Sequence, residues 1–300
     1  MFDHIGQIPA AAALKFSDRT ALVFENETFS FNEINSLVEK AAGGLGELGI
    51  LSGDTVTLYA ANSWEWIISY YAIARLGAVI NPVNTMLTPE EIEYVAKDCG
   101  AKAIITSSDK VAGILGITEV SDVSYIISFG ASVDKSVVSF DKLIATDLKA
   151  PNPTEIAPTS LSTIGYTSGT TGHPKGAMQS HQAVIINGAM TSQMQMRGHD
   201  DCVINALPCP HVYANVIMMS IMMFGSKLVL HRTFDADTVL ADIEKYQATI
   251  VDGVPAMYMF MLNSPALKKW TYPVSSAVMW VGRQCQSPRW RRLRQRLKFL

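Results

Sequence analysis

The 300-residue sequence predicts an α/β protein with mainly parallel sheets, and three observations lead to this expectation. Short apolar segments of strand length alternate repeatedly with longer segments of helix length. Helix-start signals of Ser or Thr followed three positions later by Glu mark where two of the longer segments begin. The short segments are rich in Val, Ile and Ala, as buried strands are, and such alternation is typical of helix-flanked parallel sheets.

The first elements are a hairpin and a helix. Residues Thr20 to Phe31 alternate in character around the polar segment Glu25-Asn26-Glu27, which predicts two short antiparallel strands. Ser30 is followed three positions later by Glu33, the spacing of a capping box. We therefore expect a helix from this point to about Leu48.

A strand, a helix and a second strand follow. Gly53-Asp54 predicts a turn into the apolar strand Thr55 to Ala60. The segment Ser63 to Leu76 has helical periodicity and is followed by Gly77, which favours a helix end. Val79 to Asn81 is then predicted to be the next strand.

The following segment begins with a strong helix start. In Thr88-Pro89-Glu90-Glu91, threonine is placed to cap the helix, proline occupies its first turn, and glutamate completes the capping box. Ala103 to Thr106 and Tyr125 to Ser128 are predicted to be further buried strands.

Length and a proline-rich segment together predict two subdomains. Three hundred residues exceed what one hydrophobic core usually supports. Ala150-Pro151-Asn152-Pro153 to Pro158 has the composition of a linker. We expect a first α/β subdomain over residues 1–150 and a second, incomplete one over residues 151–279.

Composition narrows the class of protein. Hydrophobic residues make up 48% of the chain and charged residues 17%, which is ordinary for a folded globular protein. No apolar run approaches the roughly 18 residues of a membrane span, and the first residues lack the pattern of a secretory signal. The four cysteines form no CxxC pair, so we expect reduced thiols, no metal site and a cytoplasmic location.

A glycine- and hydroxyl-rich segment carries the chemistry. The strand-like residues 163–166 lead into T-S-G-T-T-G-H-P-K-G, residues 167–176. Glycines let a backbone turn tightly around an anion, hydroxyl groups donate hydrogen bonds to phosphate oxygens, and Lys175 adds a positive charge. The segment predicts a phosphate-binding loop, but not a Walker A loop, because no glycine directly precedes Lys175 and no Ser or Thr follows it.

Residues 166–176, Y-T-S-G-T-T-G-H-P-K-G, resemble the phosphate-loop signature of the adenylate-forming superfamily, and the chain is similar to its acyl-CoA synthetases over residues 10–279. Weaker blocks follow in the same order, notably L-P-C-P-H at 207–211 and G-V-P-A-M-Y at 253–258. The resemblance implies the stacked, helix-flanked β-sheets of the superfamily's large N-terminal domain, cut short within its second subdomain.

The resemblance also implies cofactors and roles. ATP, Mg²⁺ and coenzyme A are expected, with a carboxylic acid as substrate and no nucleic acid as partner; the oligomeric state is not predicted. Lys175 would stabilise charge on the departing pyrophosphate as the acid's carboxylate attacks the α-phosphorus. The nucleotide-binding residues implied are Thr167, Ser168, Gly169, Thr170, Thr171, Gly172 and Lys175.

Two further residues are implied to contact substrate. His211, in the L-P-x-x-H segment, would line the acyl and adenylate site rather than act as a general base, and it is placed with Lys175 among the catalytic residues. Tyr213 is expected to form a wall of the acid pocket, with a place in the core as the alternative.

The acid itself is predicted to be fatty or otherwise apolar. A helix expected over Asn215 to Phe224 carries four methionines beside this segment, although methionine rows are more often core than pocket. Residues 210–215 contain no aspartate, whereas amino-acid-activating relatives usually place one soon after this block. An amino-acid substrate is therefore disfavoured.

The last 21 residues differ from the rest. From Trp280 to Leu300 there are six Arg and one Lys without an acid, whereas only four Arg occur before them. Read one base earlier, the codons of residues 279–286 can spell V-G-G-A-P-M-P, which is similar to the family's next motif. We expect residues 280–300 to be a frameshifted basic tail; the rival interpretation is an arm that binds nucleic acid or membrane.

These expectations bear on activity. The C-terminal lid domain of the family, with its catalytic lysine, is not in this sequence. We therefore expect a ligase by lineage whose 300-residue form has little or no activity. A non-catalytic nucleotide-binding remnant is the alternative, and a luciferase-like oxygenase is a third that this part of the chain does not separate.

Overall fold

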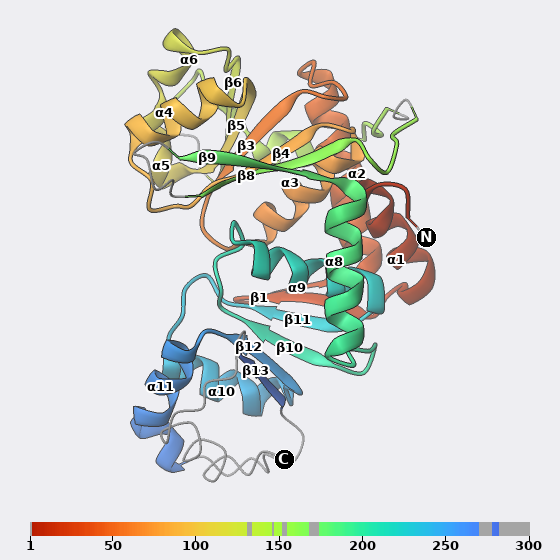
Figure 1. The fold of residues 1–300 in the computed structure, drawn as a ribbon, viewed down its shortest axis with the longest axis vertical. Helices are drawn as coiled ribbons and strands as arrows, with labels where there is room; N and C mark the ends of the chain where they lie inside the picture. Colours follow the sequence, from red (N-terminus) through yellow and green to blue (C-terminus); the bar gives the residue numbers. More distant parts are fainter. Residues whose placement is uncertain are drawn as a thin grey trace.

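The computed structural model describes residues 2–130, 134–145, 147–151, 155–167, 174–269 and 278–281 (Figure 1). Its strands form two sheets, and helices flank both of them. The predicted α/β class with helix-flanked sheets is therefore confirmed. Among the described residues, none of the helices combines the length and apolar character that a bilayer-spanning segment needs.

The larger sheet has seven strands within the described residues. In spatial order these are β7 (Val138–Ser139), β6 (Tyr125–Phe129), β5 (Ala101–Ser107), β3 (Thr55–Tyr59), β4 (Val79–Pro82), β8 (Leu161–Thr167) and β9 (Lys175–Ser180). Neighbours pair in parallel except β8 and β9, which form an antiparallel hairpin. The strands predicted at 55–60, 79–81, 103–106 and 125–128 are confirmed. Strand β9 is not predicted from apolar runs, because most of its residues are exposed at the sheet edge.

The second sheet has six strands within the described residues. In spatial order they are β13 (Val278–Val281), β12 (Ile250–Gly253), β10 (Cys202–Asn205), β11 (Lys227–Leu230), β1 (Thr20–Phe24) and β2 (Glu27–Ser30). Pairing is parallel except in the predicted β1–β2 hairpin, which is confirmed. The predicted start of the frameshifted tail, residue 280, falls within β13 and stays a prediction, and residues 282–300 of that tail lie outside the described residues.

Each sheet contains a hairpin from a part of the chain that is distant from most of its other strands. The hairpin β1–β2 belongs to the sheet that otherwise follows residue 200, whereas β8–β9 belongs to the sheet formed by residues 55–139. Leu22 of β1 pairs with Leu228 of β11, far along the sequence. The predicted division near residue 150 stays a prediction, but the chain crosses between the sheets on both sides of it.

Helices fill the space between the sheets and cover their outer faces. The helical segments are η1 (Ile5–Gln7), α1 (Ile8–Phe16), α2 (Phe31–Glu47), α3 (Trp64–Arg75), α4 (Pro89–Asp98), α5 (Ser108–Ile114), α6 (Ile117–Val120), α7 (Phe140–Ile144), α8 (His181–Met194), α9 (Val212–Phe224), α10 (Ala236–Tyr246), α11 (Pro255–Asn263) and η2 (Pro265–Lys269). One continuous apolar core joins α1, α2, α3 and α9 to strands of both sheets. A separate cluster lies under α4 and α5 against β5 and β6.

The predicted helix starts have the expected capping contacts. Ser30 Oγ accepts the backbone N–H of Glu33 at 3.2 Å, and the Glu33 carboxylate accepts the Ser30 N–H at 2.7 Å. Thr88 caps α4 in the same way, with Pro89 in the first turn. Gly77 ends α3 with φ of +76°, a conformation that favours glycine. These helices are specified by residues close to their own ends.

Candidate active site

The base of the predicted phosphate loop is a strand pair. Thr167, the last residue of β8, lies opposite Lys175, the first residue of β9, in antiparallel register. The intervening residues Ser168, Gly169, Thr170, Thr171 and Gly172 lie outside the described residues, as does His173. The structure thus brings the two ends of the glycine- and hydroxyl-rich segment together, with Lys175 exposed at its base.

Side chains of the larger sheet hold β8 in place below the loop. Asn81 donates from Nδ2 to the carbonyl oxygen of Ile164 at 2.8 Å and accepts the Thr57 hydroxyl at 2.9 Å. The Tyr166 hydroxyl donates to the carboxylate of Asp98 at the end of α4. Two of these bonds join β8 to other elements, β4 and α4, and Thr57 of β3 orients Asn81, so the start of the loop is fixed on the sheet.

A cavity of about 620 Å³ lies beside the carboxyl-terminal ends of strands from both sheets. The residues that follow β3 and β4 contribute Asn62 and Thr85, and those that follow β10, β11 and β12 contribute Leu207, Arg232 and Val254. Because β8 is parallel to β4, the phosphate loop leaves the same edge of the larger sheet. Such edges are where α/β proteins bind ligands.

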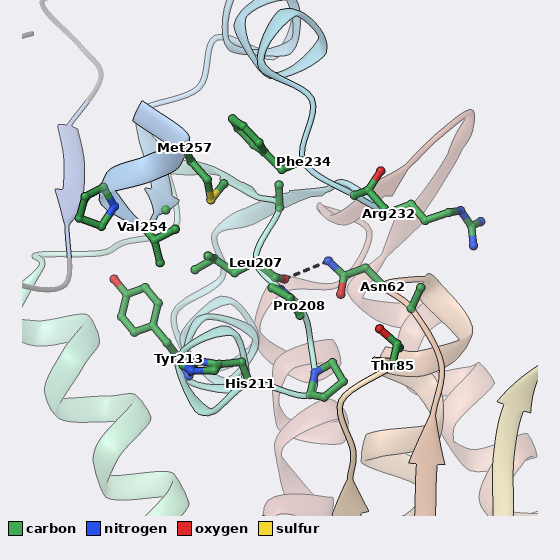
Figure 2. Close-up of a pocket in the computed structure, with 16 residues that line it drawn as sticks. Asn62, Thr85, Leu207, Pro208, His211, Tyr213, Arg232, Phe234, Val254 and Met257 are labelled. Atoms are coloured by element: carbon green, nitrogen blue, oxygen red, sulfur yellow. Dashed lines mark hydrogen bonds between the residues drawn. The ribbon is translucent and has the colours of Figure 1, made fainter. Parts of the chain in front are cut away.

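The cavity has two chemically different ends. Figure 2 shows Asn62, Thr85 and Arg232 on one side, and Tyr213, Val254 and Met257 on the other. Arg232 donates from Nε to the Glu25 carboxylate at 2.9 Å, so its charge is paired at the surface. One side is therefore polar, and the other is largely apolar.

His211 lines the cavity and also caps a helix. Its Nδ1 accepts the backbone N–H of Tyr213 at 3.2 Å, and its carbonyl accepts that of Asn215 at 3.1 Å. Helix α9 therefore begins at Val212, three residues before the predicted start, because an imidazole acts as the cap. When neutral, this ring carries its proton on Nε2, which makes it a hydrogen-bond donor. Its predicted catalytic role stays a prediction, and the geometry fits positioning better than proton abstraction.

Tyr213 lines the cavity from the first turn of α9 and belongs to a polar network. Its hydroxyl donates to Asp252 Oδ1 at 3.0 Å and accepts from Gln195 Nε2 at 3.3 Å. Burial, together with the neighbouring Asp252 carboxylate, raises the pKa of Tyr213 to about 12. The hydroxyl thus keeps its proton and donates it in the hydrogen bond to Asp252.

A buried ion pair supports Tyr213. Arg197 contacts both carboxylate oxygens of Asp252, at 2.8 and 2.6 Å, and both side chains are fully shielded from solvent. Burial raises the pKa of Asp252, and the guanidinium opposes that shift. Sequence reasoning does not identify either residue as part of the site. Asp252 stands in a strand and Arg197 in a loop, and no local motif joins them.

Asn62 is another cavity residue that the sequence motifs do not single out. Its Nδ2 donates to the carbonyls of Leu207 and His231, both at 2.9 Å, and its Oδ1 accepts the Cys209 N–H at 2.6 Å. The only sequence signal is its place directly after a predicted strand, where ligand-binding residues of α/β proteins often lie.

The methionines of α9 are core residues. Met218, Met219 and Met222 are buried, and none of them lines the cavity. A Cβ placed on Gly188 of α8 would lie 2.8 Å from the Cβ of Met219, so the two helices are in close contact there. The alternative that these methionines pack rather than bind is therefore the observed one. Met257 of α11 lines the cavity instead.

The described residues include no cluster of side chains that could bind a metal ion. Within the described part of the chain, no three His, Cys, Asp or Glu side chains come close enough to hold an ion.

Residues 10–299 match the profile of the family described as AMP-binding enzyme. The sequence is 31% identical to 4-coumarate-CoA ligase 1 of Narcissus pseudonarcissus over 274 residues, which cover 87% of this chain and 49% of that protein. It is 32% identical to 4-coumarate–CoA ligase 5 of Oryza sativa subsp. japonica over 261 residues, or 84% of this chain and 47% of that protein. The chain spans about half the length of these curated relatives.

The fold also matches a solved structure. The long-chain-fatty-acid-CoA ligase FadD1 of Archaeoglobus fulgidus superposes with a TM-score of 0.87 at 24% identity, over 98% of this chain and 60% of that one. At this identity the match shows the shared fold.

Proposed function

The chain belongs to the AMP-binding enzyme family, and on that premise we propose that it is the front part of an acid–CoA ligase. The carboxylate of the acid attacks the α-phosphorus of ATP, the bond to pyrophosphate breaks, and acyl-AMP forms. A coenzyme A thiol, on losing its proton, then attacks the acyl carbon and AMP leaves. Activation of an acid by ATP is common to the ligases that this chain resembles.

The pairing of Thr167 with Lys175 is the observation that carries this proposal. It closes the glycine- and hydroxyl-rich segment into a hairpin loop at the sheet edge that also contributes Asn62 and Thr85 to the cavity. A loop so placed can hold the polyphosphate while an acid occupies the cavity beside it. The backbone and hydroxyl donors of the loop would then stabilise charge that develops on the pyrophosphate.

The proposal includes roles for the residues at the base of the loop, for Mg²⁺ and for His211. Thr167 and Lys175 at the base of the loop would contact the phosphates of ATP, and Mg²⁺ bound to these phosphates would offset their charge. His211 would donate from Nε2 toward the acyl-adenylate. We assign the coenzyme A site to no described residue.

The acid is proposed to be fatty or otherwise apolar. The Tyr213 ring, Val254 and Met257 line one end of the cavity, and their largely apolar surfaces suit a hydrocarbon group. Both a straight-chain acid and an aryl acid satisfy this description.

Binding of ATP tests the proposal most directly, because we propose that these 300 residues, tested by themselves, convert little ATP and acid to product. We expect ATP to bind in equilibrium dialysis and Lys175→Met to weaken it about 10-fold or more, the usual effect of losing a charged hydrogen-bond partner. Lys245→Met is the matched control, since Lys245 is an equally exposed lysine on α10. Equal affinity in all three proteins would refute the assignment of the loop.

A pyrophosphate-release assay with a panel of acids tests whether these 300 residues carry out the adenylation step by themselves. ATP binding without pyrophosphate release is expected of these residues alone. Substantial turnover would contradict the predicted low activity while supporting the reaction.

A further inference from the structure

A buried polar network lies directly behind the apolar end of the cavity. Arg197 stands in the connection between α8 and β10, and its guanidinium contacts Asp252, the Ser220 hydroxyl at 3.0 Å and Gln195 Oε1 at 2.6 Å. Asp252 precedes the cavity-lining residues Gly253 and Val254. The ion pair thus ties together three elements: the loop after α8, helix α9 and the exit of β12.

This network determines which part of Tyr213 can meet a ligand. The hydroxyl proton points to Asp252 Oδ1 at 3.0 Å, and the Gln195 amide occupies one acceptor position of the same oxygen. In Figure 2 the ring stands at the cavity wall, with its hydroxyl end directed toward Val254 and away from Arg232. The ring face of Tyr213 is left for the ligand, whereas its hydroxyl proton is used within the protein.

Stability alone does not explain a charged pair at this position. Removing two charges from water is unfavourable, and an apolar pair of similar volume often stabilises a protein equally well or better. What an apolar pair would not supply is an acceptor for the Tyr213 hydroxyl. The distinctive effect of Asp252 is therefore the orientation of Tyr213, and that of Arg197 is to keep Asp252 ionised.

We propose that Arg197 and Asp252 are positioning residues that hold the hydroxyl of Tyr213 away from the acid, so that this site selects acids with a hydrocarbon far end and rejects those carrying a hydrogen-bond acceptor there. The inference rests on the proposed function, because it takes the cavity to be the acid site. Two other large polar side chains of the wall are likewise engaged within the protein: Asn62 with Leu207, His231 and Cys209, and Arg232 with Glu25.

Octanoate and 7-oxooctanoate are the probes, since they differ only by an acceptor at the far end. Calorimetric titration of the unaltered chain is expected to show at least about 10-fold tighter binding of octanoate, the effect of leaving a buried acceptor unpaired. In Arg197→Met/Asp252→Leu the hydroxyl of Tyr213 is released and can donate to the ketone. The preference is expected to fall about 5-fold or more in that variant.

Tyr213→Phe distinguishes orientation from general disruption. In the otherwise unaltered chain it is expected to change the preference less than about 2-fold, because the hydroxyl does not reach the acid. Added to the double variant, it is expected to restore the original preference. Arg75→Met/Glu39→Leu serves as the control, because it removes another ion pair, of 2.7 Å between Nε and Oε1, whose residues do not line the cavity. The preference is expected to stay unchanged in this variant.

Two results would overturn this inference but not the proposed function, provided that ATP binding still depends on Lys175. One is an unchanged preference in the double variant. The other, which needs no altered ion pair to fold, is a Tyr213→Phe chain that loses affinity for 7-oxooctanoate only. A chain that binds neither ATP nor either acid would overturn the proposed function as well.

Discussion

The Oδ1 atom of Asn62 accepts the backbone N–H of Cys209 at 2.6 Å, although the two residues are 147 positions apart. The same amide donates to the carbonyls of Leu207 and His231. One buried side chain therefore joins the loop after β3 to two loops of the other sheet, at the wall of the cavity.

Replacing Asn62 by alanine is expected to lower the free energy of unfolding by about 2–4 kcal/mol, since three buried backbone groups lose their partner. Urea denaturation measures the change. Asn187→Ala on the exposed face of α8 is the control, with an expected loss below about 0.5 kcal/mol. Similar losses in the two variants would mean that the Asn62 contacts add nothing to stability.

The ion pair of Arg197 and Asp252 is expected to be strongly non-additive. Arg197→Met alone leaves a carboxylate buried without its countercharge and should reduce the free energy of unfolding by about 3–5 kcal/mol. Arg197→Met/Asp252→Leu should recover most of that loss. A double-mutant cycle that includes Asp252→Leu alone, measured by urea denaturation, gives the coupling energy between the two side chains. A loss in the double variant equal to the sum of the two single losses would contradict this coupling.

Stability should fall in mild acid because of His181. Burial, assisted by the nearby His4, lowers the pKa of this fully enclosed imidazole to about 4, from 6.5 in an unfolded chain. Between these values the unfolded state binds the extra proton, so the free energy of unfolding decreases as the pH drops through that window, by at most about 1.4 kcal/mol per pH unit.

His181→Gln removes this titration and should flatten the pH dependence of the urea midpoint between pH 6.5 and about 4. The exposed His199→Gln serves as the reference variant. If both variants keep the slope of the unaltered chain, the imidazole of His181 is not responsible for it.

Two glycines with the same backbone conformation should respond differently to alanine. Gly49 and Gly225 have φ of +80° and +81°, but a Cβ on Gly49 meets nothing within 4 Å, whereas one on Gly225 would lie 2.6 Å from Cδ1 of Phe16. Gly49→Ala should destabilise by about 1 kcal/mol, from the backbone alone. Gly225→Ala should destabilise by about 2–4 kcal/mol, because the Phe16 ring must also move. Thermal melts measure both, and equal losses would rule out the steric contribution.

Local signals predicted the elements well. The capping residues Ser30 and Glu33, or Thr88 and Glu91, lie within one helical turn of each other, so sequence spacing alone determines their geometry. The β1–β2 hairpin was predictable for the same reason, because its strands are joined by a short polar turn. The motif around Lys175 is equally local, and its two ends do pair.

Contacts between distant residues were not predictable in this way. Nothing near Asp252 signals that Arg197 will neutralise it, and nothing near Asn62 signals three backbone partners in the other sheet. His211 was placed at the site by its motif, but its use as a helix cap was not foreseen because imidazole is an uncommon cap. Features of this kind depend on which strands become neighbours, and that order is set by the whole chain.

The exchange of strands between the sheets has a consequence for synthesis on the ribosome. Strand β1 pairs with β11 across the sheet, so Leu22 cannot pair with Leu228 until the ribosome has translated the roughly 200 residues between them. At the usual speed of about 5–20 residues per second, this delay is roughly 10–40 s. During that interval the edge of β1 that pairs with β11 stays uncovered on the nascent polypeptide, where it can pair with other strand edges.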